Sequence, residues 1–173
     1  RLPQDVQTVF LKDTVREELA DVGADVENLP FDIKPLLDKH PYDLSGGEQQ
    51  LAAFAKVMAA DPKILLLDEP TKGLDAAAKQ NIIAILRRLK AEGVTVVIVT
   101  HDVEFASSCA DRCALFFGER AVTTETTRRF FAENSFYTTA VCRMTRGYFD
   151  GATDVRYAAE LCRLNGRKNG GGA

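Results

Sequence analysis

The sequence lacks the features that mark membrane, secreted and zinc-binding proteins. No stretch approaches the roughly 18 apolar residues that cross a bilayer, and the amino end carries no signal-peptide pattern. No C-x-x-C pair occurs, and no histidine stands at ligand spacing from a cysteine, which disfavours a zinc site or a disulfide framework. We therefore expect a soluble, cytosolic chain with reduced thiols at Cys109, Cys113, Cys142 and Cys162.

A strong charge of one sign is also missing. The formal net charge of -3 gives no reason to expect nucleic acid as a partner, because nucleic acids are bound by basic surfaces. The 173 residues, of which 46% are hydrophobic and 27% charged, suffice for a globular domain with a core. The sequence begins with RLPQDVQTVF and has no start methionine, so we expect it to be a piece of a longer polypeptide.

Hydrophobic periodicity predicts an α/β fold preceded by a small helical region. Residues 13–40 predict two or three short helices, and a longer helix is expected from Ser45 to about Ala60. The buried face of this longer helix is predicted to hold Leu51, Phe54, Ala55 and Met58. KILLLDEP and VTVVIVTHD are continuous apolar runs, typical of strands buried on both faces of a parallel sheet. The helix predicted over 76–92, with Ile82, Ile83, Leu86 and Leu89 on its buried stripe, completes a βαβ unit.

The remaining third of the chain predicts two strands and several short helices. RCALFF and AVTTE are expected to extend the sheet. TTRRFFAEN, SFYTTAVCRMTR and TDVRYAAELCRL have the spacing of amphipathic helices. Periodicity alone would pack four aromatic residues of this part into a core, namely Phe130, Phe131, Phe136 and Tyr137. The tail 165–173 is expected to be disordered.

Polar residues follow both strands of the βαβ unit. Asp68 and Glu69 end the first strand and His101 follows the second, and ligands of open parallel sheets bind beyond these carboxyl ends. One acid can hold a hydrated magnesium ion while the other orients a water, and a neighbouring histidine can contact a phosphate. Taken alone, Glu69 is equally well interpreted as a solvated acid and His101 as a histidine at the rim of the sheet. Their placement at the ends of two neighbouring strands favours a catalytic or phosphate-binding role.

Ser45, Gly46, Gly47 and Glu48 pose a second question, because glycine is costly in a helix. A capping box of the form S-x-x-E explains Ser45 and Glu48 and leaves both glycines unexplained. Bare backbone at a helix amino end allows an anion to approach the free amides, so the stretch is predicted to contact a phosphate. A phosphate-cradling G-x-x-x-x-G-K-S/T loop is absent, so the chain is expected to touch a nucleotide without cradling it.

Four motifs in order, LSGGEQQ, ILLLDEP, GLD and His101 after VIVT, resemble an ABC-type ATPase cassette over residues 1 to about 118. The resemblance implies a P-loop NTPase-like α/β core with a partial parallel sheet, a helical signature subdomain at about 13–60, and a phosphate loop upstream of Arg1. It also implies two cassettes that sandwich two ATP molecules, so that residues 45–48 serve the γ-phosphate held by the partner cassette.

The same resemblance implies a role for each site residue. Asp68 would bind Mg²⁺ through water and Glu69 would be the general base. His101 would contact the γ-phosphate, and Gln4 would sense Mg²⁺ and the membrane subunits. Asp75 would couple the two sites, besides being the expected amino cap of the following helix.

The carboxyl segment resembles one particular group of these cassettes. TKGLD, FFAENSFYTTAVCRMTR and a later LC resemble the second cassette of fused ATPases in energy-coupling factor transporters, which import vitamins or metal ions. This implies an ATPase on the inner face of the cell membrane, with residues 119–164 as an appendix and no nucleic-acid partner. The isolated chain, without its phosphate loop, is expected to be inactive.

Two alternatives stay open. One is a non-transport ABC ATPase, although the short segment between Gln4 and Leu44 leaves no room for the long coiled coil of the repair and chromosome types. The other is a catalytically incomplete nucleotide-dependent interaction module, against which Glu69 and His101 argue.

Overall fold

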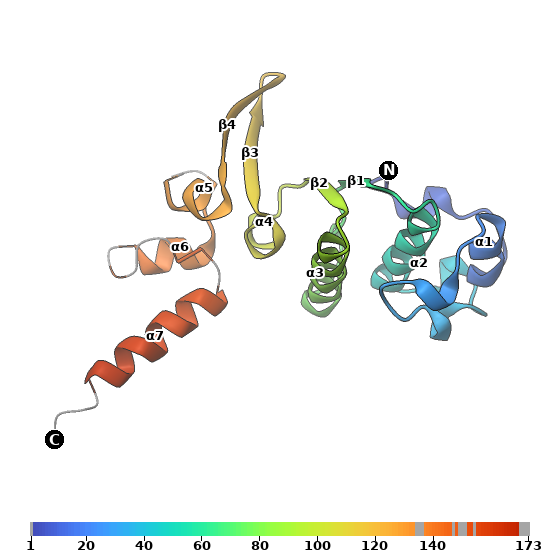
Figure 1. The fold of residues 1–173 in the computed structure, drawn as a ribbon, viewed down its shortest axis with the longest axis horizontal. Coiled ribbons are helices and arrows are strands. Elements are labelled where there is room, and N and C mark those ends of the chain that lie inside the picture. The colour runs from blue at the N-terminus through green and yellow to red at the C-terminus, as the bar shows by residue number, and fades with distance from the viewer. Residues whose placement is uncertain (1, 134–136, 147, 149–151, 154, 170–173) are drawn as a thin grey trace. The chain divides into compact units, whose positions relative to one another are not determined.

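The computed structural model describes residues 2–133, 137–146, 148, 152–153 and 155–169, apart from the side chains of 156, 157 and 165–169. The chain divides into two compact units, Arg1–His101 and Asp102–Ala173. The cassette boundary expected near residue 118 lies inside the second unit. Each unit is described by itself below (Figure 1).

The first unit opens with short helical turns and one longer helix. The turns are η1 (Val6–Val9), α1 (Val15–Asp21), η2 (Val26–Asn28), η3 (Lys34–Leu36) and η4 (Pro41–Asp43). The longer helix is α2 (Gly46–Met58), which confirms the expected helix apart from its last two residues. Its most buried face carries Gln49, Gln50, Ala52, Ala53, Phe54 and Ala55, whereas Leu51 and Met58 are only partly buried. The buried face is therefore rotated slightly from the predicted one.

The predicted βαβ unit is present. Strands β1 (Ile64–Asp68) and β2 (Thr95–Val99) pair in parallel, from Ile64 opposite Thr95 to Asp68 opposite Val99. Helix α3 (Ala76–Ala91) connects them, and its predicted stripe from Ile82 to Leu89 is buried. Gly93, which follows the helix with a φ of +88°, is the predicted stop signal.

The strands differ from the prediction in their burial. Leu65 and Leu67 of β1 are buried, but Ile64, Leu66, Val97 and Val99 are between 45% and 63% exposed. Helix α3 packs against β2 and covers one face of the strand pair, whereas the other face is left largely exposed among the described residues. The expectation of burial on both faces is therefore wrong for this chain.

The described residues of the second unit form a hairpin and four helices. Strands β3 (Arg112–Phe117) and β4 (Arg120–Thr126) pair with each other in antiparallel, as a two-stranded sheet separate from that of β1 and β2 in the described chain, so the expected extension of the parallel sheet is wrong. Gly118 and Glu119 both have positive φ, the geometry of a tight hairpin turn, which explains why β3 pairs with the strand that directly follows it. The helices are α4 (Val103–Cys109), α5 (Thr127–Glu133), α6 (Ala140–Thr145) and α7 (Val155–Asn169).

Two expectations for the carboxyl part need correction. Phe130 and Phe131 are buried with an edge-to-face contact, whereas Tyr137 is 48% exposed and Phe136 lies outside the described residues. Helix α7 runs to Asn169, into the tail predicted to be disordered, because extending an existing helix costs far less than starting one. Residues 170–173 lie outside the described residues.

Candidate functional site

The carboxyl ends of β1 and β2 form the first candidate site. Because the two strands are parallel neighbours, Glu69 and His101 emerge side by side, as the sequence predicted. His101 Nδ1 lies 2.7 Å from Glu69 Oε1, and the His101 backbone N–H donates to the same oxygen at 3.0 Å. The other oxygen, Oε2, accepts a hydrogen bond from the Thr100 hydroxyl at 3.0 Å. The carboxylate is thus held by the two residues that follow β2.

Thr100 is the member of this cluster that sequence reasoning did not single out. Its only signal in the sequence is its place directly before His101, because a hydroxyl at a strand end is otherwise unremarkable. The backbone adds a further constraint at Glu69, whose φ is +46° and whose N–H donates to the Val99 carbonyl at 2.8 Å. A non-glycine residue in this conformation costs free energy. Asp61 and Glu119 adopt it at turns, whereas Glu69 adopts it at a strand end, a setting in which such strain recurs at functional sites.

The start of the chain pairs with β1 beside Asp68. Leu2 forms a parallel bridge with Leu67, its N–H donates to the Leu66 carbonyl at 2.9 Å, and its carbonyl accepts from the Asp68 N–H at 3.3 Å. Gln4 follows two residues after this bridge, in a bend of the chain.

The donor set at this edge fits a magnesium ion that keeps most of its own water. No group of three or more His, Cys, Asp or Glu side chains gathers into a metal site among the residues that the structure describes. Mg²⁺ is commonly bound by one or two carboxylates together with substrate phosphates and water, which asks no more of the protein than Asp68 and its neighbours.

The second candidate site is the amino end of α2. Ser45 caps the helix in the predicted capping box: its hydroxyl faces the Glu48 N–H at 3.4 Å, and its own N–H donates to Glu48 Oε2 at 2.8 Å. Lys39 Nζ lies 2.9 Å from Glu48 Oε1. The Lys39 ammonium, together with the hydroxyl and N–H of Ser45, lowers the pKa of Glu48 to about 2. The carboxylate at this helix end is therefore charged and fully engaged.

The structure gives Gly47 a packing role that the sequence did not reveal. A Cβ at Gly47 would lie 2.9 Å from the Ala78 Cβ of α3, closer than such atoms approach in proteins. A Cβ at Gly46 would lie 3.5 Å from Leu74 Cδ2, which is ordinary contact. Packing against Ala78 therefore explains the glycine at position 47, which the capping box left unexplained, but does not explain the glycine at position 46.

A shallow hollow of about 190 Å³ joins the ends of α2 and α3. Ser45, Gly47 and Glu48 line it from α2, and Asp75 and Asn81 line it from α3 and its cap. Asp75 caps α3, as predicted, by accepting a hydrogen bond from the Ala78 N–H at 2.7 Å. The structure therefore brings Ser45, Gly47 and Glu48 together with Asp75. At the strand ends it brings Glu69 together with His101.

Comparison with known proteins gives consistent matches. The family described as "AAA domain, putative AbiEii toxin, Type IV TA system" matches residues 7–107. The "Putative ABC transporter ATP-binding protein" of Bacillus cereus is 43% identical over 132 residues, which are 76% of this chain and 24% of that protein. The "Phosphate import ATP-binding protein PstB 2" of Mycobacterium tuberculosis is 42% identical, over 62% of this chain and 39% of its own. The chain thus spans about a quarter to two-fifths of the length of these relatives.

Solved structures share the fold. Clostridium perfringens cbiO1, part of the ABC transporter complex cbiONQ, matches with a TM-score of 0.67 at 23% identity, over 84% of this chain and 62% of its own. MJ0796, a bacterial ABC transporter cassette solved as a dimer, matches with a TM-score of 0.56 at 25% identity, over 70% and 61% of the two chains. No described helix is both long and apolar enough to cross a bilayer.

Proposed function

Because the chain belongs to the ABC-type ATPase cassettes, we propose that it provides half of a composite ATP site in the ATP-hydrolysing subunit of a transporter. Glu69 is the general base toward the attacking water, and Asp68 holds Mg²⁺ through water. The observation that carries the proposal is the Glu69 carboxylate at the end of β1, held by Thr100 and His101 at the end of β2. Each carboxylate oxygen has two lone pairs, so a carboxylate held in this way still has a free position for a water.

His101 completes the site in this proposal. A proton on Nδ1 suits the contact with the Glu69 carboxylate, and it leaves Nε2 of the neutral ring as an acceptor. A phosphate oxygen needs a donor, so contact with the γ-phosphate requires the imidazolium form of His101. The His101 side chain is 81% exposed, so a phosphate can reach its ring.

The second half of each site comes from another cassette. Ser45, Gly46, Gly47 and Glu48 are proposed to contact the γ-phosphate held by that partner, with Asp75 coupling the two sites through the hollow that it shares with them. Gln4, two residues after the bridge between Leu2 and β1, is proposed to sense Mg²⁺ and the integral membrane subunits. When bound, Mg²⁺ neutralises charge on the phosphates, and this chain's residues orient the water.

The transporter subtype is proposed from the carboxyl segment. TKGLD and FFAENSFYTTAVCRMTR favour an energy-coupling factor importer of a vitamin or metal ion, with this chain on the inner face of the cell membrane. The similarity in fold to cbiO1 over 84% of the chain is compatible with that placement. The domain division proposed is a cassette to about residue 118 followed by an appendix over 119–164.

Glu69→Gln in the complete gene product tests the catalytic assignment. The amide keeps the size of the side chain but cannot take a proton from water, so ATP binding should persist while turnover falls about 10²- to 10⁴-fold. ATP binding is measured by equilibrium dialysis and turnover by phosphate release. Thr100→Val is the matched comparison, since it removes one hydrogen bond to Glu69 and should cost much less. Hydrolysis near the wild-type rate in Glu69→Gln would remove Glu69 as the base.

A further inference from the structure

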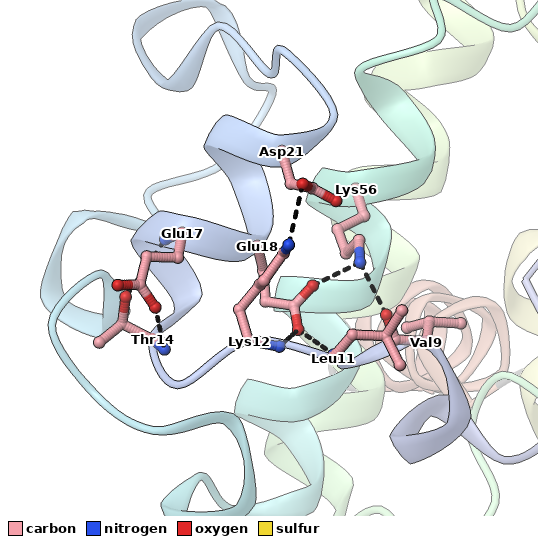
Figure 2. Close-up of polar contacts among 8 residues, drawn as sticks. All are labelled: Val9, Leu11, Lys12, Thr14, Glu17, Glu18, Asp21 and Lys56. Carbon is pink, nitrogen blue, oxygen red and sulfur yellow. Dashed lines mark hydrogen bonds and ion pairs between the residues drawn. The ribbon is translucent and has the colours of Figure 1, made fainter.

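We infer that the buried ion pair between Glu18 and Lys56 is a positioning device, which fixes the segment after Gln4 to the helix that carries the signature glycines. Glu18 lies on α1 and Lys56 near the end of α2, with 2.5 Å between Lys56 Nζ and Glu18 Oε2 (Figure 2). The inference rests on the proposed function, because it concerns how two ATP-contacting segments move together.

The pair is one of the most enclosed ionic contacts of the unit. The Glu18 side chain is 1% exposed and that of Lys56 14%, whereas the partners of the Arg16–Asp38 pair on the same surface are 58% and 84% exposed. Burial alone would raise the pKa of Glu18, but the hydrogen bonds from Lys56 and from the N–H groups of Lys12 and Leu11 outweigh it and lower that pKa. The Glu18 carboxylate is therefore charged despite its burial.

The remaining hydrogen bonds of the pair go to a third segment. Lys56 Nζ donates to the Val9 carbonyl at 2.7 Å. Glu18 Oε1 accepts from the backbone N–H of Lys12 at 2.5 Å and from that of Leu11. Lys12 Nζ in turn lies 3.0 Å from Asp21 Oδ1 at the outer side of the cluster (Figure 2). The pair thus holds the chain from Val9, the last residue of η1, through residues 10–12, which belong to no helix or strand.

This arrangement joins two functional segments mechanically. The held segment begins at the last residue of η1, the short turn that follows Gln4. Helix α2 is capped by Ser45 at its start and carries Lys56 near its end. A 13-residue helix moves as a rigid rod, so a shift at Gly46 and Gly47 reaches Lys56 and, through it, Val9. Closure of α2 onto a phosphate therefore carries the segment after Gln4 with it.

A purely stabilising role would not need charges. Buried ion pairs are often replaced by apolar residues of similar volume without loss of stability, so their retention is better explained by the specific arrangement that they impose. The two explanations differ in what an apolar pair does. An apolar pair keeps the fold but offers the backbone groups of residues 9–12 neither a donor nor an acceptor, and so no longer holds them.

Hydrogen–deuterium exchange on the complete gene product, with and without ATP and Mg²⁺, tests the inference. In the wild type, ATP should slow amide exchange in residues 4–12 and in residues 45–48, and both segments should become protected over the same range of ATP concentration. In Lys56→Met, exchange at Leu11 and Lys12 without ATP should be about tenfold faster, because a charge-assisted network is lost. With ATP, protection at 45–48 should persist while protection at 4–12 falls about tenfold or more.

Control variants separate positioning from folding. Lys56→Arg keeps the charge and should restore joint protection, and Arg16→Met removes an exposed pair and should behave as wild type. Lys56→Met leaves Glu18 buried without its cation and can unfold. The apolar double variant Glu18→Met/Lys56→Met then decides, because it removes both the acceptor and the donor and is expected to show the same loss of joint protection.

Each other outcome overturns the inference. Wild-type protection at 4–12 in the variants would overturn it and leave the proposed ATP site intact. Unfolding of the double variant would make the pair a folding element only. Absence of ATP-dependent protection at both segments of the wild type would overturn the proposed function and the inference together.

Discussion

At the scale of the residue, the glycine pair shows two requirements acting on neighbouring positions. Gly47 faces the Ala78 Cβ and Gly46 faces only Leu74 at ordinary distance, so the absence of a side chain is needed for packing at one position and not at the other. The approach of an anion to the helix end therefore remains the explanation for the glycine at position 46, because packing does not require it there.

Substituting alanine at the two positions should separate these requirements. Gly47→Ala should lower the free energy of unfolding by about 1–3 kcal/mol, because its methyl group would overlap Ala78. Gly46→Ala should change that free energy by less than about 1 kcal/mol, and in the stabilising direction, because alanine favours helix. Urea unfolding measures both. Equal effects at the two positions would contradict the packing role of Gly47.

The charge state of Glu48 makes a prediction about pH. Its pKa is lowered from 4.5 to about 2 by Lys39 and Ser45, so the carboxylate stabilises the fold above pH 4.5, and this contribution is lost as the pH falls toward 2. Lys39→Met removes the first of these causes and should reduce stability at pH 7 by an amount that shrinks on acidification. Urea unfolding of both proteins from pH 7 to pH 2.5 checks this. A difference that stays constant over that range would contradict it.

At the scale of the element, the strand β1 buries one side and exposes the other. Leu65 and Leu67 are at most 2% exposed, whereas Ile64 and Leu66 alternate with them on the open face. A continuous apolar run cannot reveal this difference, because covering layers come from elsewhere in the fold. Helix α2, by contrast, follows from its capping box, and α3 from its apolar stripe and Gly93.

Adjacent leucines in β1 should therefore respond differently to truncation. Leu65→Ala should cost about 2–5 kcal/mol of unfolding free energy, as expected for a cavity in the core. Leu66→Ala, at a position that is 45% exposed, should cost under about 1.5 kcal/mol in this chain. Thermal and urea unfolding of the two variants make the comparison. Equal losses would show that the open face of β1 is covered in solution.

At the scale of the whole molecule, the chain is two units whose internal contacts differ in kind. In the first unit, parallel strands place Glu69 beside Thr100 and His101, although these residues are far apart in the sequence. In the second unit, β3 and β4 pair locally through the turn at Gly118 and Glu119. Sequence patterns found the strands of both units, but only the turn geometry decides that the second pair stands as a hairpin.

The sequence by itself determined the motifs, the βαβ unit, the two helix caps and the residues at the strand ends, because these follow from local periodicity and from neighbours in the chain. The tertiary structure alone decided which apolar face of the sheet is open, why Gly47 must be bare, and that Glu18 and Lys56 enclose the backbone of residues 9–12. These features depend on distances between segments remote in sequence, and hydrophobic patterns do not encode such distances.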